Sequence, residues 1–474
     1  MTDRQAEGSQ TQGHRWRRLP IYGRLSTFRR GFVSTFSLDV VGRGLSAIAT
    51  VLFIRTLGVD SFAYLVLFLT VGQFAGGALT GGVRTRYLRA EAERVSRGHE
   101  QATGFALALL TGLGLIVGTG LLFWAGVSLV DGGDREFVLL ATLYTAGHAS
   151  IELAMFHYQA HLRFSKGGTV GVARSVSLLT VAVLATLGVI GSGPAVAGAA
   201  AAGIAAVAAI ACFPLIRQTL AVPARAALGG HFGSESAWLT LYYLASAGFA
   251  YANVFVVASL LDDEAIASYG AAIRYLAIVL GPVPALLAVL RVRTSQHDVV
   301  DSTKVQTNML LGWIKQTILP AGAAVGIAAL TAPFFIPLLN SGNYPDTVPI
   351  FQLLMIAALV IYTTMPGASM LMAQRRYRTL ATIYAVALLI EVVAAVLAAE
   401  LGGVIAVAAT AAVVGAGEAA TTAFVAMRIG VPVEEPTAAV VGAGEAATTA
   451  FVAMRVRAPA EEPAAQGEAQ PSPT

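Results

Sequence analysis

The sequence predicts an all-α polytopic membrane protein with twelve transmembrane helices, and three observations support this prediction. Of 474 residues, 56% are hydrophobic and only 12% are charged, against about 25% charged in an average soluble domain. Apolar runs of about twenty residues, long enough to cross a hydrocarbon core of roughly 30 Å, follow one another through most of the chain. Lys and Arg gather in alternate connections. Because the runs are continuous rather than alternating, helices are favoured over a barrel.

In the first half, each apolar run ends at charged or turn-forming residues. "RTLGVD" separates the first two runs, "RAEAERVSRGHE" the second and third, "DGGDRE" the third and fourth, "HLRFSK" the next pair and "GSGP" the last pair. The expected helices are 31–54, 61–83, 103–130, 137–160, 169–190 and 195–216.

The second half is divided in the same way. Its runs are separated by "LDDEA", "RVRTSQHDVVDSTK", "NSGNYPDT", "QRRYR" and "ELGG". The expected helices are 236–261, 267–290, 309–338, 349–374, 379–399 and 402–427.

The charges of the connections predict the orientation. Connections on the side of the N-terminus are rich in Lys and Arg, whereas the opposite turns hold only Arg55 and Arg135. The positive-inside rule therefore places the N-terminus and Arg428 in the cytoplasm of a multi-pass plasma-membrane protein. The polar, basic first thirty residues do not resemble a cleavable signal, and they could also bind anionic membrane lipids.

Several function classes are disfavoured by what the sequence contains. A single cysteine, Cys212, permits no intrachain disulfide or thiol metal cluster. We find no phosphate-binding Gly-Lys-Ser/Thr loop and no metal-ligand spacing of His or Cys, so neither a cofactor nor a metal is expected. The net charge of +4 is a topology signal rather than a sign of nucleic-acid binding. Because every outer turn is short, a membrane-embedded enzyme such as a sugar polymerase or glycosyltransferase is disfavoured against a transporter.

Six plus six helices let both halves begin and end on the same side, so an internal repeat must be parallel. Helices one and two resemble helices seven and eight, each pair closing with Arg-x-Arg. The second helix of each pair also carries Gly or Pro, which predicts matched interruptions and a transport site between the halves. Close packing through small residues is the alternative. The residues concerned are Gly72, Gly76, Gly77, Gly81 and Gly82 in one half and Gly281, Pro282 and Pro284 in the other.

The chain is thus expected to have five parts. They are a basic cytoplasmic arm (1–30), an N-terminal six-helix lobe (31–216), a cytoplasmic linker (217–235), a C-terminal six-helix lobe (236–428) and a tail (429–474).

The stretches "FIRTLGVDSFAYLVLFLTVGQFAGGALTGGVRTRYLR", "SYGAAIRYLA" and "FIPLLNSGNYPDTVPIFQLLMIAALVIYTTMPGASMLMAQRRYRTL" resemble polysaccharide flippases of the multidrug/oligosaccharidyl-lipid/polysaccharide (MOP) exporter superfamily. The resemblance covers about residues 30–428 and rests on diffuse patterns. It implies two six-helix lobes facing one another in a V, as in MATE-like transporters, that open alternately inward and outward. It also implies movement of isoprenoid-linked sugars from the inner to the outer leaflet.

Ionisable residues within the helices are the candidate site residues, because charge in a membrane is costly and usually functional. Arg43 and Arg274, one from each lobe, are expected to face a central cavity and to bind an anionic headgroup such as pyrophosphate, with Arg174 as a third candidate. In the alternative, Asp39 neutralises Arg43 four residues away, while Arg174 and Arg274 snorkel toward the membrane surfaces.

His148 and Glu152, also four residues apart, could carry a proton and couple transport to an ion gradient. A histidine bonded to a carboxylate for packing alone is the alternative. Glu391 and Glu418, near the middle of the last two helices, are either coupling sites or interhelical hydrogen-bonding groups.

Together these features predict an alternating-access flippase for a lipid-linked (polyprenyl pyrophosphate) oligosaccharide, acting as a monomer with no nucleic-acid partner. Glycosyltransferases and a polymerase of the same pathway are candidate partners. The alternative is an ion-coupled small-molecule or multidrug exporter of the same fold.

A nineteen-residue phrase occurs twice, at 410–428 and at 437–455. The first copy completes the twelfth helix. The second has an apolar part of only about 18 residues that is interrupted by Glu445, so it is a marginal span. We expect it to lie against the cytoplasmic face or in a poorly ordered tail.

Overall fold

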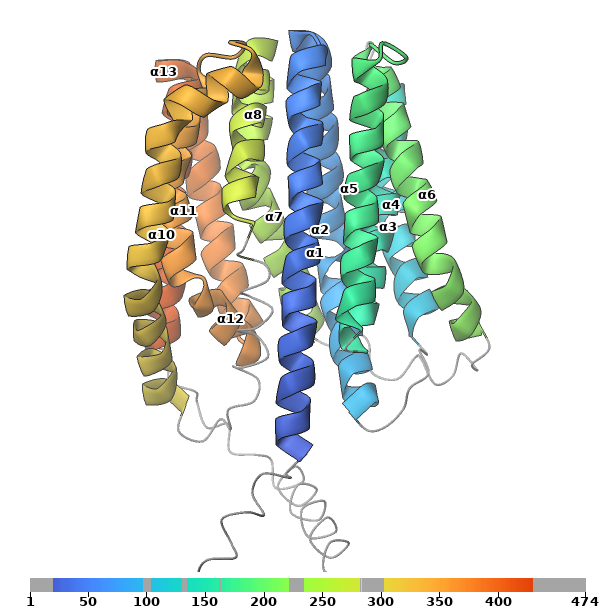
Figure 1. The fold of residues 1–474 in the computed structure, drawn as a ribbon, viewed down its shortest axis with the longest axis vertical. Helices are drawn as coiled ribbons and strands as arrows, with labels where there is room; N and C mark the ends of the chain where they lie inside the picture. Colours follow the sequence, from blue (N-terminus) through green and yellow to red (C-terminus); the bar gives the residue numbers. More distant parts are fainter. Residues whose placement is uncertain are drawn as a thin grey trace, which may run out of the picture. The chain divides into compact units, whose positions relative to one another are not determined.

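The computed structural model describes residues 20–96, 104–129, 134–161, 163–220, 234–281, 283 and 302–428. Within these ranges every regular element is a helix (Figure 1). The helices are α1 (Pro20–Thr56), α2 (Val59–Ser96), α3 (Phe105–Leu129), α4 (Arg135–Ala160), α5 (Phe164–Thr186), α6 (Gly193–Leu220), α7 (Ser234–Leu260), α8 (Asp263–Val279), α10 (Ser302–Asn340), α11 (Thr347–Thr364), α12 (Pro366–Ala373) and α13 (Tyr377–Arg428).

Ten of the described helices are long and apolar enough to cross a membrane. One of them, α13, reverses at Gly403, whose φ of 64° favours glycine. Its two limbs are therefore the expected helices at 379–399 and 402–427. With α8 and the two limbs counted separately, the described helices make the twelve expected passes.

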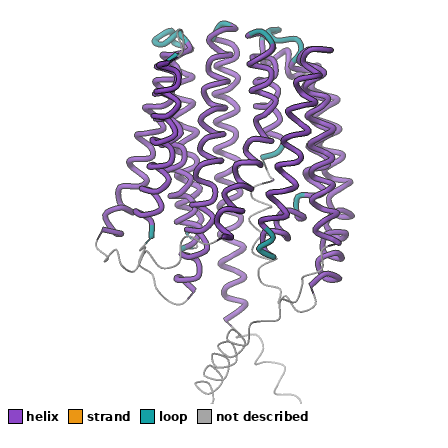
Figure 2. The backbone as a smooth tube through the Cα atoms, turned by 180° about the vertical axis from the view of Figure 1, so that it is seen from behind, coloured by secondary structure: helices purple, strands orange, loops and turns teal. Residues whose placement is uncertain are grey.

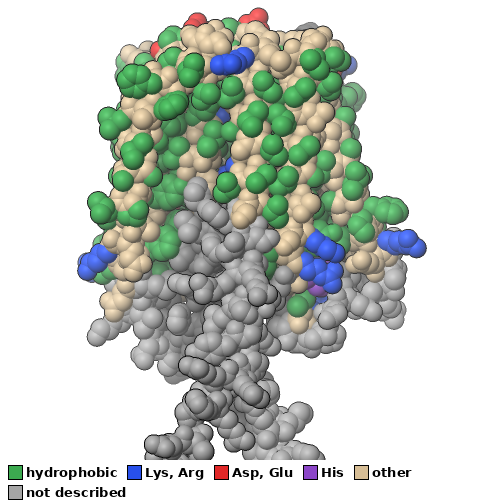
Figure 3. All heavy atoms as spheres, viewed as in Figure 1, with side chains coloured by type: hydrophobic (Ala, Val, Ile, Leu, Met, Phe, Trp, Pro, Cys, Tyr) green, Lys and Arg blue, Asp and Glu red, His purple; other side chains and the backbone are tan. Residues whose placement is uncertain are grey.

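Large apolar side chains cover the outer wall of the bundle. Leu122 of α3 is 76% exposed, and Leu330 and Phe334 of α10 are 76% and 78% exposed. Figure 3 shows such side chains over most of one face, with acidic groups at one end and basic groups mainly near the other. An apolar surface of this extent is typical of contact with lipid. The chain is a multi-pass membrane protein.

The packing repeats between the two halves of the chain. In the first half α1 packs on α5, α2 on α4, α3 on α4, and α4 on α6. In the second half, α8 and α10 pack on α11. There α7 lies against the first limb of α13, with Gly248 against Leu388, and α11 lies against the second, with Ala357 against Gly415. The same pairs recur six helices later, which confirms two six-helix lobes related by a parallel repeat.

The connections between helices are short at the end opposite the chain's first described residues (Figure 2). The tenth pass breaks between α11 and α12, where Pro366 begins the new helix, as the Pro366–Gly367 pair predicts. In contrast, α10 runs continuously through Pro320.

Some expected boundaries differ from the structure. Helix α1 begins at Pro20, so residues 20–30 of the expected arm are helical, because their side chains do not interrupt helical hydrogen bonding. The described part of the eighth pass ends at Val279. Residues 284–290, most of the linker and the second copy of the repeated phrase at 437–455 lie outside the described residues. The five-part division stays a prediction.

Candidate functional site

The two lobes meet along α2, which packs on α7 and α8, while α1 contacts α8 and α10. At one end Arg55 donates to the carbonyls of Leu338 and Leu339 at 2.6 and 2.9 Å. Toward the other end, the hydroxyls of Thr85 and Tyr243 lie 2.6 Å apart. The lobes therefore contact one another on both sides of the mid-helix region.

Glycines on α2 let α4 approach closely. A Cβ at Gly72 would lie 2.3 Å from the ring of Tyr144, and one at Gly76 would lie 3.3 Å from the ring of His148. Gly72 and Gly76 are one helical turn apart, as are Tyr144 and His148, so two aromatic rings of α4 fit two gaps on α2.

The expected interruption of the second helix is wrong. Helix α2 is continuous from Val59 to Ser96, because its glycines serve close packing. Gly81 and Gly82 provide the same kind of contact to α7, where added Cβ atoms would lie 2.4 Å from Tyr243 and 2.8 Å from Thr240. In the other lobe α8 does end before Gly281.

A chain of four polar side chains crosses the N-terminal lobe from α5 to α2. Arg174 Nη1 lies 3.5 Å from His148 Nδ1, and His148 Nε2 lies 3.3 Å from Glu152 Oε1. Glu152 also forms an ion pair with Arg84. Since a guanidinium can only donate, His148 accepts at Nδ1 and presents its Nε2 hydrogen to Glu152. The ring of Tyr144 stacks on His148 with centroids 6.0 Å apart.

Arg43 faces the second lobe. Its Nε is 2.9 Å from Asp39 Oδ2, as their spacing predicts, and its Nη1 donates to the carbonyl of Ala277 on α8 at 3.5 Å. A Cβ at Gly281 would lie 2.9 Å from Arg43 Cδ. Asp39 therefore pairs with the Nε side of the Arg43 guanidinium, while the Nη1 side points to the boundary between the lobes.

Arg274 of α8 approaches the same region from the C-terminal lobe. It lies within electrostatic range of the side chains of Tyr144 and Tyr251, and Arg174 lies within range of the same two side chains. The Tyr251 hydroxyl donates to Gln73 Oε1 at 3.3 Å. Arg174 and Arg274, which belong to different lobes, therefore lie near the same two tyrosines.

We call these residues the central polar cluster. Its members are Asp39, Arg43, Gln73, Arg84, Tyr144, His148, Glu152, Arg174, Tyr251 and Arg274. With four guanidinium groups, two carboxylates and a neutral His148, its net charge is +2. Figure 3 shows basic side chains inside the seam between α8 and α1, within an otherwise apolar wall. Such a site can bind anions through charge-assisted hydrogen bonds.

Glu391 and Glu418 lie apart from this cluster, on the two limbs of α13. Glu391 is 1% exposed, and neither carboxyl oxygen has a hydrogen-bond partner within 3.5 Å among the described groups. Asn253 and Tyr269 are close by. Glu418 accepts from Thr422 Oγ1 at 2.8 Å and lies near Tyr384. The structure therefore does not bring the two acids into one site with His148.

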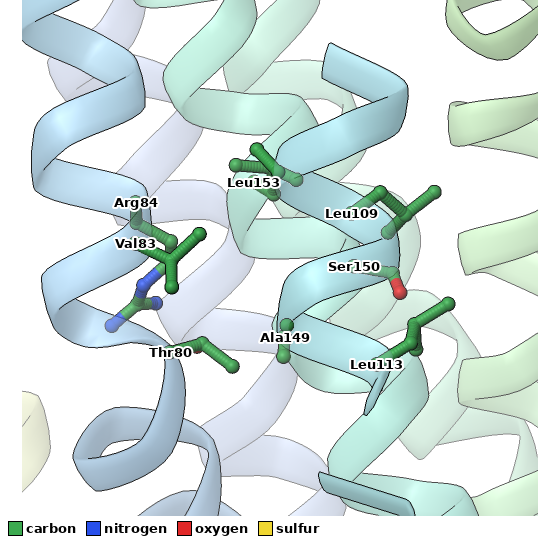
Figure 4. Close-up of a pocket in the computed structure, with 10 residues that line it drawn as sticks. Thr80, Val83, Arg84, Leu109, Leu113, Ala149, Ser150 and Leu153 are labelled. Atoms are coloured by element: carbon green, nitrogen blue, oxygen red, sulfur yellow. The ribbon is translucent and has the colours of Figure 1, made fainter. Parts of the chain in front are cut away.

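Several members of the cluster have no role that is predicted from the sequence. Arg84 follows the expected helix 61–83 directly and so belongs to a basic segment expected on the cytoplasmic side, but it is only 8% exposed and is paired inside the lobe. It borders a cavity of about 10 Å³ between α2, α3 and α4 (Figure 4). Tyr144, Tyr251 and Gln73 could have been noticed as polar groups in the middle of apolar runs.

A larger cavity of about 430 Å³ lies between α10 and α11, lined by Trp313 and Tyr362.

The expectation that no metal is bound stays a prediction, although three possible ligand groups lie together in the structure. Within the described residues, Glu91, His157 and His161 place one possible ligand atom each within 4.8 Å of one another. His157 and His161 are four residues apart, a spacing that one helical face brings together. The carboxylate comes from α2 and could not be assigned without the tertiary structure.

The sequence matches no family model and no curated protein. Solved structures do match. One is an inward-facing multidrug resistance MATE family transporter of the MOP superfamily, 17% identical, covering 83% of this chain and 97% of that chain with a TM-score of 0.62. The chain has a MATE-like fold.

Two further matches support this assignment of the MATE-like fold. A MOP superfamily transporter from Pyrococcus furiosus, described by the reverse polarity of its binding pocket, is 14% identical, with 84% and 94% of the two chains covered and a TM-score of 0.60. The lipid II flippase MurJ, in an inward closed conformation, is 14% identical, with 82% and 86% covered and a TM-score of 0.60.

Proposed function

We propose that this protein is an alternating-access transporter that flips a lipid-linked oligosaccharide with an anionic pyrophosphate headgroup across the plasma membrane. The observation that carries the proposal is that Arg174 and Arg274, from opposite lobes, lie near the same two tyrosines, Tyr144 and Tyr251. Arg43 adds a third guanidinium at the same boundary. Guanidinium groups match phosphate oxygens in a bidentate fork, and the half-buried Tyr251 offers an aromatic ring suited to a sugar or an isoprenoid.

The lobe contacts support alternating access. The Arg55 contacts and the Thr85–Tyr243 contact lie on opposite sides of the central polar cluster along the helices. Breaking one set while keeping the other would expose the cluster to one side of the membrane. With the N-terminus in the cytoplasm, as the positive-inside rule predicts, Arg55 belongs to the outer gate and Thr85 to the inner gate.

The relatives in fold leave two substrate classes to compare. A lipid II flippase and multidrug transporters share the fold, and fold alone does not define substrate. The net positive charge of the cluster favours an anionic lipid-linked substrate over a cationic drug. The pathway's glycosyltransferases and polymerase are then its candidate partners.

An ion-coupled small-molecule exporter is the second candidate. The observation that favours it is the buried carboxyl group of Glu391, whose oxygens have no hydrogen-bond partner within 3.5 Å among the described residues, with Asn253 nearby. An unpartnered intramembrane acid is a common ion or proton carrier.

The deciding experiment uses purified protein in liposomes that contain a fluorescent polyprenyl-pyrophosphate sugar, and it measures exposure of the sugar on the far leaflet. We expect flipping by the native protein and at least a tenfold loss in Arg43→Ala with Arg274→Ala. The matched control is Arg135→Ala, because Arg135 is an exposed arginine at the start of α4. If the lipid stays in place while a cationic dye moves along a pH gradient, the exporter replaces the flippase.

A further inference from the structure

A second polar cluster lies on the two helices that the Arg84–Glu152 pair joins, toward the C-terminal ends of α2 and α4. Glu91 of α2, His157 of α4 and His161, the residue that caps α4, form its centre. His161 Nε2 is 2.9 Å from Glu91 Oε1, and the rings of His157 and His161 have centroids 4.4 Å apart. Glu91 is 2% exposed and His157 is 4% exposed.

Neighbouring side chains hold the three groups in place. The hydroxyl of Tyr87 is 2.6 Å from His157 Nδ1, which leaves Nε2 of that ring for another partner. Arg94 donates to Glu91 Oε2 at 3.1 Å, so Oε1 remains directed at the histidines. Hydrogen bonds of this kind, from a second group to the far atom of a ligand, orient ligands in metal sites and raise metal affinity.

We propose that Glu91, His157 and His161 bind a divalent transition metal ion of the Zn²⁺ class. Two imidazoles and one carboxylate are a donor set that suits Zn²⁺, with a fourth position for water. Mg²⁺ and Ca²⁺ prefer sites made of oxygen ligands. Neighbouring ligands of a tetrahedral zinc lie about 3.3 Å apart, so three donor atoms already within 4.8 Å need only small side-chain rotations.

The ion would connect α2 to α4 independently of the Arg84–Glu152 pair. Both links join the helices that carry the glycine gaps and the aromatic rings of the central polar cluster. The metal therefore stabilises the N-terminal lobe at a place away from the substrate, and its binding does not depend on which substrate the protein moves.

A hydrogen-bond network without metal is the competing explanation, since Glu91 can accept from His161 and Arg94 alone. The two explanations differ in a direct measurement. Protein purified without a polyhistidine tag and treated with a chelator is titrated with Zn²⁺ against a chromophoric competitor. Co²⁺ is added separately to record its ligand-field absorption, and thermal unfolding is followed with and without Zn²⁺.

We expect one tight site per chain, a Co²⁺ spectrum of tetrahedral type and a rise in melting temperature with Zn²⁺. His161→Ala and Glu91→Gln should each remove the site. Tyr87→Phe, which keeps all three ligands, should weaken binding about 10- to 100-fold. Glu136→Gln, an exposed acid at the other end of α4, should bind as the native protein does, and excess Mg²⁺ should not compete.

Three results would overturn the proposal. One is a native protein that binds no Zn²⁺ after chelation, and another is an unchanged site in His161→Ala. The third is equal weakening by Glu136→Gln and Tyr87→Phe. Because Tyr87→Phe retains the ligands and most of the packing, it decides the question even if a ligand variant fails to fold.

Discussion

Arg84 of α2 forms an ion pair with Glu152 of α4 inside the N-terminal lobe, and Glu152 also contacts His148. The Arg84 side chain is 10% exposed and that of Glu152 is 28% exposed. Taking two charges out of water is costly, so the pair persists because each partner compensates the other. This pair ties the central polar cluster to the packing of α2 on α4.

Breaking the pair from one side should destabilise the protein. We expect Glu152→Gln to lower the free energy of unfolding by about 3 kcal/mol, the lower end for a buried pair, because Glu152 is partly exposed. Replacing both partners, as Arg84→Met with Glu152→Leu, should recover most of the loss. Denaturant unfolding in detergent measures both. The control is Glu136→Gln, an exposed acid of α4 that should change stability by about 0.5 kcal/mol or less; equal effects at the two glutamates would contradict the prediction.

The glycine gaps on α2 predict a steric effect. Gly72→Ala places a methyl group against the ring of Tyr144, and we expect it to cost about 1–3 kcal/mol of stability. In Gly114→Ala on α3 the new methyl group meets no described atom within 4 Å, so the loss of backbone freedom in the unfolded chain should leave it neutral or more stable. Thermal unfolding of both variants checks this prediction. A Gly72→Ala protein as stable as the control would contradict it, because α2 and α4 could then move apart without a loss of stability.

The Arg55 contacts predict a shift in the conformational equilibrium. Arg55→Ala removes two charge-assisted hydrogen bonds to α10. If the conformation that makes these bonds loses about 1 kcal/mol of stability, the outward-open population should rise roughly fivefold. Spin labels at Asp60→Cys and Asn343→Cys, in a Cys212→Ala background, would report the separation of the lobes by electron paramagnetic resonance. Arg135→Ala is the matched outer-turn control. An unchanged distance distribution in Arg55→Ala would remove this residue from the proposed outer gate.

Glu391 separates the two candidate functions. If the protein is an ion-coupled exporter, Glu391→Gln should abolish accumulation driven by an ion gradient, because the amide cannot exchange a proton or balance a cation. If it is an anionic-lipid flippase that uses the central polar cluster, lipid flipping should persist in Glu391→Gln and be lost in Arg174→Ala. Parallel dye and lipid assays in the same liposomes make the comparison, with Glu400→Gln, an exposed acid on α13, as the control.

The sequence was sufficient for the number of passes because membrane spans are defined by local composition. A run of apolar residues must be helical in lipid whatever surrounds it, so most expected helices, including those that meet at Gly403, fall where the structure has them. Contacts between residues four apart, such as Asp39 with Arg43, could also be predicted from the sequence, because one helix positions both residues. The roles proposed for Arg43, Arg174, Arg274, His148, Glu391 and Glu418 remain predictions.

Contacts between side chains on different helices could not be predicted from sequence patterns. The glycines of α2 were expected to interrupt a helix, but only the position of Tyr144 on α4 reveals that they accommodate a ring. Arg84 was assigned to a cytoplasmic connection, because nothing in its own segment identifies Glu152 as its partner.

The sequence by itself determined the fold class, the order of the helices and the pairs of ionisable groups along one helix face, since these depend on hydropathy and helical period. The tertiary structure decided which charges are compensated and which guanidinium groups of the two lobes share a site. It also decided that a carboxylate from α2 joins two histidines of α4. These relations depend on how separate helices pack, and in a membrane that packing follows from the shapes and small residues of neighbouring helices rather than from apolar periodicity.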